Sequence, residues 1–237
     1  MIACIVILVI GLIVAGLFTC EKVRKYSIKA TIIKATASIL FIILALVANH
    51  VRGNTWFGTF AIGALALGML GDIWLELKYV YPQDDKPLTY AGFVCFGLGH
   101  ILYIIGMIKT FYIEGHIVNL IVPFAIGLLA ALLILVLEKP LKLQIGDMKV
   151  ICFLYSVLLF SMVSMAFSLL ILHGFKMVTL ILVSIGGALF AISDLVLSQT
   201  YFGQGHDKPF DLISNVAMYY IAQNLIAFSI YFIDTVL

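Results

Sequence analysis

The sequence predicts an all-α, polytopic integral membrane protein with eight transmembrane helices. Three observations lead to this fold class. Of the 237 residues, 64% are hydrophobic and only 11% are charged, whereas soluble domains carry about 25% charged residues. The mean hydropathy is +1.19, so most of the chain is suited to hydrocarbon and not to water. Long apolar segments alternate with short polar ones, which is typical of helices that cross a bilayer several times.

Eight apolar segments account for the chain. Each is close to the roughly 20 residues that an α-helix needs to cross a hydrocarbon core of about 30 Å. The connections are short, and no stretch is long or polar enough for a second, soluble domain, so residues 1–237 are expected to form a single domain. In order, the segments are residues 2–20, 28–48, 56–77, 90–111, 117–137, 150–172, 177–198 and 212–233.

The first segment is expected to be a true span and not a cleavable signal. It lacks a basic region before its apolar run, and the basic cluster follows the run instead. The third and seventh segments each contain an aspartate, Asp72 and Asp194. The fourth and eighth each contain a central polar residue, His100 and Gln223.

The distribution of Lys and Arg predicts the orientation. The connections after the first, third, fifth and seventh segments, together with the start of the second, carry 11 of the 14 basic residues. Basic residues favour the cytoplasmic side, so a cell-membrane, multi-pass protein with both termini outside is expected. The 11 residues are Lys22, Arg24, Lys25, Lys29, Lys34, Lys78, Lys86, Lys139, Lys142, Lys149 and Lys208, against Arg52, Lys109 and Lys176 on the other side.

Asp72 and Asp194 are the strongest indication of a functional site. A carboxylate in the hydrocarbon region costs a few kcal/mol even on lenient insertion scales, so such residues usually have a function. With the segment ends above, Asp72 lies about 9 Å and Asp194 about 7 Å from the cytoplasmic end of its helix, at 1.5 Å per residue. The two acids are therefore predicted at one depth, near the cytoplasmic leaflet.

The two halves of the chain show a short internal similarity. Gly71-Asp72 and Ser193-Asp194 each occur in the third segment of a four-segment half. His100 follows Asp72 by 28 residues (100 − 72) and Gln223 follows Asp194 by 29 (223 − 194). This pattern is consistent with a parallel 4+4 internal repeat whose halves meet at the site, and chance similarity between apolar helices accounts for it equally well.

Polar residues recur at helical spacing within the segments. Residues three or four apart share one face of a helix, and polar faces are expected to turn away from lipid, around a shared pocket. The stripes are Asp72 with Glu76, His100 with Tyr103, Lys34 with Ser38, Asp194 with Ser198, and Asn215 with Tyr219 and Gln223; Tyr155 and three serines give the sixth segment a weaker polar side.

Structural roles are also open for several of these residues. Asn224 and the serines of the sixth segment are typical of interhelical hydrogen bonds, and His100 is compatible with a purely structural bond. Glu76 is close enough to the segment end to be solvated. Lys34 has the length to reach the headgroups or to neutralise one of the two aspartates, but it cannot neutralise both comfortably.

Other kinds of site find no support in the sequence. It contains no HExxH, GxSxG, P-loop or dinucleotide-binding motif, so neither a metal site nor a cofactor is expected. The net charge of +2 gives no reason to expect nucleic acid as a partner. The four cysteines, Cys4, Cys20, Cys95 and Cys152, lie in or at the ends of apolar segments and are expected to be reduced packing residues.

Four motifs in order resemble the YhhN-like family of eight-span membrane proteins. They are Gly71-Asp72-x-x-Leu75, Phe96-x-x-x-His100-x-x-Tyr103, Ser193-Asp194 and Tyr219-x-x-x-Gln223-Asn224-Leu225-Ile226. The resemblance covers Lys34 to Ile226. In the second segment, only the lysine of the family's Lys-Pro pair is present, as Lys34, and the sixth segment matches the family's pattern only weakly. Because characterised members are lysoplasmalogenases, the resemblance implies hydrolysis of the 1-alkenyl (vinyl) ether bond of a lysoplasmalogen.

The predicted site suits that chemistry. A vinyl ether hydrolyses after protonation at carbon, and water then captures the resulting cation. One neutral carboxylic acid and one carboxylate supply the proton donor and the base, so Asp72 and Asp194 are the expected catalytic residues, with a membrane lysophospholipid as partner. The residues expected to bind or orient the substrate are Lys34, Glu76, His100, Tyr103, Tyr219, Gln223 and Asn224.

Two other functions are compatible with buried polar groups. A small proton-coupled membrane transporter would use Asp, His and Gln as a proton relay, and parallel repeats are found in transporters. A non-catalytic lipid-binding protein would leave the two acids without a role. The clustering of both acids at one face of the membrane favours the lipid enzyme.

Overall fold

The computed structural model describes residues 1–24, 27–203 and 208–235, and the described chain is helical with no strand. It therefore confirms the all-α prediction. The eight long helices are α1 (Ile2–Arg24), α2 (Ile28–Val51), α3 (Trp56–Val80), α4 (Asp85–Phe111), α5 (Val118–Leu137), α6 (Lys149–Leu172), α7 (Val178–Phe202) and α8 (Pro209–Ser229). Three short 3₁₀ turns, η1 (Pro82–Asp84), η2 (Gly146–Met148) and η3 (Ile230–Phe232), adjoin α4, α6 and α8.

Among the described residues, seven helices are long and apolar enough to cross a membrane, namely α1 to α7. These helices make the chain a multi-pass membrane protein. The eighth helix does not meet the same threshold of hydropathy. It carries Asn215, Gln223 and Asn224, whose side chains a helix buried among others can accommodate more easily than one facing lipid.

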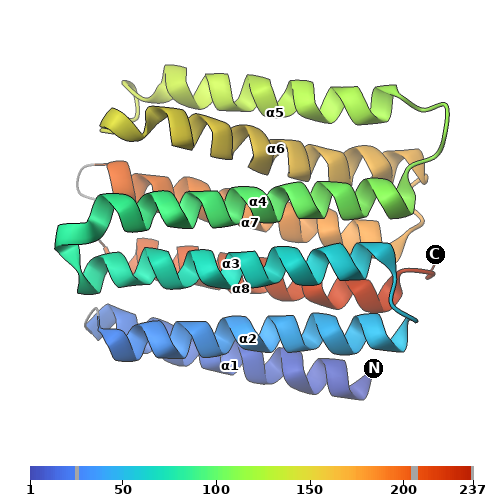
Figure 1. The fold of residues 1–237 in the computed structure, drawn as a ribbon, viewed down its shortest axis with the longest axis horizontal. Helices are drawn as coiled ribbons and strands as arrows, with labels where there is room; N and C mark the ends of the chain where they lie inside the picture. The colour runs from blue at the N-terminus through green and yellow to red at the C-terminus, as the bar shows by residue number, and fades with distance from the viewer. Residues whose placement is uncertain (25–26, 204–207, 236–237) are drawn as a thin grey trace.

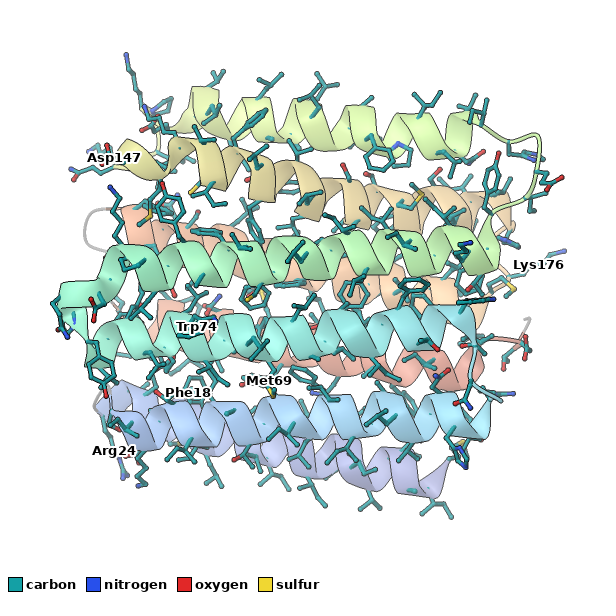
Figure 2. All side chains as sticks on the ribbon, in the orientation of Figure 1. Phe18, Arg24, Met69, Trp74, Asp147 and Lys176 are labelled. Carbon is teal, nitrogen blue, oxygen red and sulfur yellow. The ribbon has the colours of Figure 1, made fainter. Side chains whose placement is uncertain are left out.

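The helices run roughly antiparallel in one bundle (Figure 1). The C-terminal ends of α1, α3, α5 and α7 lie at one end, which we call the basic end, and the start of α1 and the end of α8 lie at the other. In Figure 2, Arg24 and Asp147 lie at the basic end and Lys176 at the opposite end. The predicted clustering of basic residues is thus reproduced, apart from Lys25, which lies outside the described residues.

Most pairs of helices that pack together are consistent with a parallel repeat of two four-helix halves. If each helix of the first half is matched with the helix four positions later, the pair α1–α2 corresponds to α5–α6 and the pair α3–α4 to α7–α8. All four pairs pack closely. Likewise α2 packs against α3 and α8, while α6 packs against α7 and α4. The halves differ in that α1 also packs on α8, whereas α5 packs mainly on α6.

Small residues allow the helices that carry the acids to approach their neighbours. A Cβ atom at Gly71 would lie 2.6 Å from the ring of Phe96, and one at Gly186 would lie 3.0 Å from the carbonyl oxygen of Ala222. Glycine at these positions therefore sets the close contact of α3 with α4 and of α7 with α8, as expected for helix packing in membranes.

The helices extend further than predicted at the basic end. α3 ends at Val80 and α7 at Phe202 instead of at residues 77 and 198, because the polar residues there are helical and packed; the Lys78 ammonium lies 3.5 Å from the centroid of the Tyr201 ring. Each aspartate is thus eight residues from its helix end (80 − 72 and 202 − 194), about 12 Å at 1.5 Å per residue. The predicted distances of about 9 and 7 Å to the helix ends were too short, and the two aspartates are equally far from the ends of their helices.

Candidate functional site

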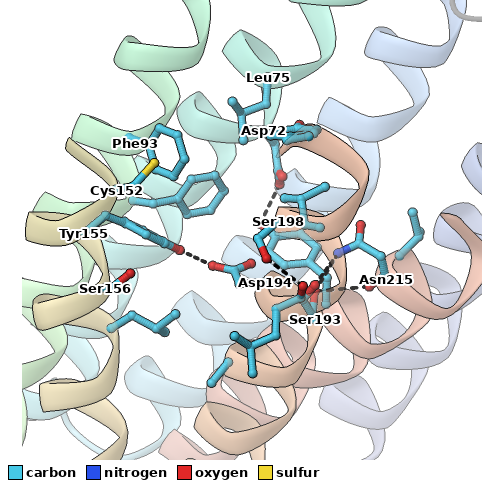
Figure 3. Close-up of a pocket in the computed structure, with 18 of the residues that line it drawn as sticks. Asp72, Leu75, Phe93, Cys152, Tyr155, Ser156, Ser193, Asp194, Ser198 and Asn215 are labelled. Atoms are coloured by element: carbon cyan, nitrogen blue, oxygen red, sulfur yellow. Dashed lines mark hydrogen bonds between the residues drawn. The ribbon is translucent and has the colours of Figure 1, made fainter. Parts of the chain in front are cut away.

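A cavity of about 110 Å³ lies toward the basic end of the bundle, and all eight helices contribute to its wall. It is large enough to hold several water molecules. Both Asp72 and Asp194 line it, from opposite sides, so the structure brings the two predicted acids to one cavity (Figure 3). Most of the wall is apolar, and the polar groups that line it include Lys34, Tyr155 and Tyr219.

Asp72 accepts three interactions from neighbouring helices. The Lys34 ammonium lies 3.2 Å from Oδ1, while the hydroxyl groups of Ser38 and Tyr219 donate to Oδ2 at 2.8 and 2.7 Å. The residue is 2% exposed, so these partners replace its hydration. These three contacts hold the Asp72 carboxyl group in place against α2 and α8.

Lys34 and Asp72 belong to a larger buried ion network. The Glu76 carboxylate, one turn after Asp72, lies 3.6 Å from the Lys34 ammonium and 2.8 Å from the Lys22 ammonium of α1. Among the described residues, the network thus joins two lysines and two carboxylates. Glu76 Oε1 has no hydrogen-bond partner, and Glu76 does not line the cavity; it connects Lys34 to α1.

Asp194 has different surroundings. Among the described residues, it forms a hydrogen bond with Tyr155 of α6, whose hydroxyl donates to Oδ2, and it forms no ion pair with a Lys, Arg or His side chain. The Tyr155 hydroxyl also lies 3.4 Å from Nε2 of His100, which is 1% exposed. A tyrosine hydroxyl both donates and accepts, so Tyr155 can serve either protonation state of Asp194.

The polar stripe of α8 faces the bundle interior, as predicted, and each of its members meets a different helix. Asn215 donates to the hydroxyl and carbonyl oxygens of Ser193, next to Asp194. Tyr219 donates to Asp72 and also accepts from the Gln223 amide at 3.2 Å. The Tyr103 hydroxyl donates to Gln223 Oε1 at 3.3 Å, so the chain of bonds extends from Asp72 to α4.

Four other predicted residues lie behind the cavity or away from it. His100 and Gln223 do not line it but contact Tyr155 and Tyr219, which do, and Tyr103 contacts Gln223. Asn224 lies further off, where its amide donates to the carbonyl oxygen of Tyr220 in its own helix. A Cβ atom at Gly11 of α1 would lie 3.5 Å from Asn224 Oδ1, so Asn224 contributes to the packing of α8 on α1.

Two residues of the site were not singled out from the sequence. Lys22 was counted with the basic cluster after the first segment, yet it is only 7% exposed and pairs with Glu76. Tyr155 was noted only as part of a weak polar side of the sixth segment. Its spacing carries no signal, because the residues it contacts, Asp194 and His100, are far away in the sequence.

The arrangement provides two carboxyl groups with unequal surroundings on the wall of one cavity. Asp72 is held by a lysine and two hydroxyl groups, whereas Asp194 has one tyrosine hydroxyl and an otherwise largely apolar wall. Environments that separate two acids in this way allow one to donate a proton while the other stays ionised. Within the described ranges, no group of three or more His, Cys, Asp or Glu side chains could hold a metal ion.

Comparison with known proteins yields one match. Neither the comparison with curated proteins nor the comparison with solved structures gave a significant match. The profile of the YhhN family matches residues 29–230, a range that begins in α2 and ends after α8 and so includes Asp72, Asp194 and most of the cavity wall. The family that the motifs resembled is thereby confirmed, and the chain belongs to the YhhN family.

Proposed function

We propose that the protein is a lysoplasmalogenase-type hydrolase that cleaves the 1-alkenyl ether bond of a lysophospholipid. The observation that supports it most is the pair of unequal carboxyl groups, Asp72 and Asp194, on the wall of one buried cavity. Membership of the YhhN family supports the same reaction through the activity that the motif resemblance implies. The products would be a fatty aldehyde and glycerophosphoethanolamine or glycerophosphocholine.

Asp194 is the proton donor in this proposal. No cation pairs with it among the described residues, and burial in a low-dielectric wall favours the neutral acid. Protonation of the vinyl carbon β to the ether oxygen, the one that carries the alkyl chain, moves the double-bond electrons to the new C–H bond and leaves an oxocarbenium ion. Asp194 becomes a carboxylate in this step, and the Tyr155 hydroxyl is placed to donate to it.

Asp72 stabilises the cation and activates water. A carboxylate has about four lone-pair positions, and Lys34, Ser38 and Tyr219 occupy three, which leaves one for a water molecule in the cavity. Water adds to the cationic carbon and loses its proton to Asp72, giving a hemiacetal. The hemiacetal hydroxyl then loses its proton to the Asp194 carboxylate, and the C–O bond to the glycerol oxygen breaks while that oxygen takes the proton held by Asp72. This step releases the aldehyde and restores both carboxyl groups to their starting states.

A panel of lysolipids tests the proposal. The purified protein should release fatty aldehyde from a 1-alkenyl lysophospholipid and leave the 1-alkyl ether and 1-acyl analogues intact, with mass spectrometry as the readout. The reason is electronic, since only the vinyl ether has a carbon basic enough to take a proton from a carboxylic acid. Ester hydrolysis needs a site for an oxyanion, and the largely apolar cavity wall offers none that we recognise.

Two results would contradict the proposal. Release of free fatty acid from the 1-acyl lysolipid at a comparable rate would make the protein a lysophospholipase. Absence of turnover with every lysolipid, together with proton-coupled uptake of a solute into proteoliposomes, would favour the transporter.

We also propose that the basic end faces the cytoplasm and that the site acts on the inner leaflet. The basic residues of this end support the orientation. In a variant without native cysteines, Cys at position 83 (Gln83→Cys, basic end) should be labelled only after the membrane is opened. Cys at position 116 (His116→Cys, opposite end) should be labelled in intact cells, since both side chains are exposed. The reverse pattern would overturn the orientation and place the site in the outer leaflet.

A further inference from the structure

The wall of the cavity changes from buried to exposed across the bundle. On the side formed by α1, α3, α4 and α8, Phe18, Leu75, Phe96 and Val216 are at most 7% exposed, and Phe93 and Asn215 are partly exposed. The side formed by α5, α6 and α7 is more open. There Ile134 and Phe160 are partly exposed, and Leu195 is 45% exposed although it lines the cavity.

The open side lies along the contact between α6 and α7, on the far side of which Tyr155 donates to Asp194. Near their middle the two helices are close, since a Cβ atom at Gly187 would lie 3.5 Å from Val163 Cγ2. At the basic end the Gln144 amide donates to the carbonyl oxygen of Phe202 at 2.7 Å and ties the α5–α6 connection to α7. Between these two contacts, Ser156 of α6 and Leu195 of α7 both line the cavity.

The composition of this opening indicates what enters it. Ile134, Phe160 and Leu195 are apolar, and they lie on helices that cross the membrane. An opening at this position meets the acyl chains of the bilayer and not water. Of the charged residues of the cavity wall, Lys22, Lys34 and Asp72 lie on α1, α2 and α3, and Asp194 lies on α7 with its carboxyl group bonded to Tyr155.

We infer that the α6–α7 opening is a lateral entrance through which the hydrocarbon chain of a single-chain amphiphile passes from the bilayer into the cavity. The polar part of the molecule would lie toward Asp72 and Lys34, and its chain would lie between Phe160 and Leu195. That the amphiphile is then hydrolysed rests on the proposed function, but the entrance itself does not.

Cys152 offers a test that needs no turnover. Its thiol lines the cavity, and the other cysteines can be replaced (Cys4→Ala, Cys20→Ala, Cys95→Ala). In proteoliposomes, N-dodecylmaleimide should label Cys152, and a membrane-impermeant, charged methanethiosulfonate present on both sides should not. Leu195→Trp should slow labelling by N-dodecylmaleimide on the order of tenfold, because the indole ring fills the entrance.

Ile192→Trp is the matched control. Ile192 is 48% exposed on the same helix but does not line the cavity, so its replacement should leave the labelling rate unchanged. If Leu195→Trp does not fold, Ile134→Trp gives the same comparison from α5. A 1-alkyl lysophospholipid, which the proposed reaction leaves intact, should protect Cys152 from labelling.

Other results would overturn the inference. Equal labelling rates in Leu195→Trp and Ile192→Trp, or rapid labelling by the charged reagent, would place the entrance at the basic end, in contact with water. Labelling is measured without product formation, so it tests the entrance separately from the reaction. If labelling is as expected but no aldehyde is released, the entrance is supported and the proposed function is wrong. If aldehyde is released but labelling is not as expected, the proposed function is supported and the inferred entrance is wrong.

Discussion

Asp194→Asn is expected to lower the rate of aldehyde release by about 10²- to 10⁴-fold, the usual effect of removing a general acid. Asparagine keeps the size of the side chain and still accepts the hydrogen bond that Tyr155 donates to Asp194, so the cavity should keep its shape. What is lost is the transferable proton. The rate is measured by trapping the aldehyde, and the thermal midpoint of unfolding in detergent shows that the fold is intact.

The control for this variant is Asp147→Asn. Asp147 also lies at the basic end, but its side chain is 83% exposed and pairs with Lys86 at the surface. There the Lys86 ammonium holds the pKa of the Asp147 carboxyl below its usual value, and an exposed pair contributes little to stability. The rate should therefore be unchanged. An Asp194→Asn protein that releases aldehyde at the original rate would exclude Asp194 as the proton donor.

Much of the fold could be predicted from the sequence because a bilayer imposes simple rules. In a bilayer, an apolar run of about 20 residues must form a helix to satisfy its backbone hydrogen bonds. The predicted number and order of the helices are therefore correct. The helix ends were less accurate, because Lys78 and Tyr201 look like connecting residues in the sequence while they pack on each other within α3 and α7. Polarity near a membrane boundary is compatible with both a loop and a helix end.

The site was predicted less completely than the fold. Asp72 and Asp194 could be found because each is costly in an apolar segment, and Ser38 and Tyr219 could be placed on polar stripes by their spacing. Lys22 could not be identified, because a lysine after a span is usually solvated and the sequence does not show that Glu76 lies opposite it. Pairings between distant helices depend on how the helices rotate and pack, which periodicity alone does not determine.

Asp72 belongs to a buried ion network, so its role could be structural or catalytic. Variants that disturb and then restore the balance of buried charges distinguish the two roles. Asp72→Asn removes the carboxylate 3.2 Å from the buried Lys34 ammonium and leaves Lys34, among the described residues, with Glu76 at 3.6 Å as its ion-pair partner. Leaving a buried charge without its partner typically costs about 3–5 kcal/mol. The single variant should therefore show both a clearly lower thermal midpoint and a loss of aldehyde release.

The double variant Asp72→Asn with Lys34→Met removes one charge of each sign and should recover most of the thermal midpoint. Methionine has a similar length and fits an apolar wall, and replacing a buried ion pair by apolar groups is often neutral for stability. The recovered protein should still release no aldehyde, because the carboxylate that stabilises the cation and accepts the proton from water is absent. Coupling between the two sites is obtained from the full double-mutant cycle, with both single variants measured in the same detergent. If the double variant regained activity together with stability, Asp72 would serve only to neutralise Lys34, and the base in the reaction would have to be another group.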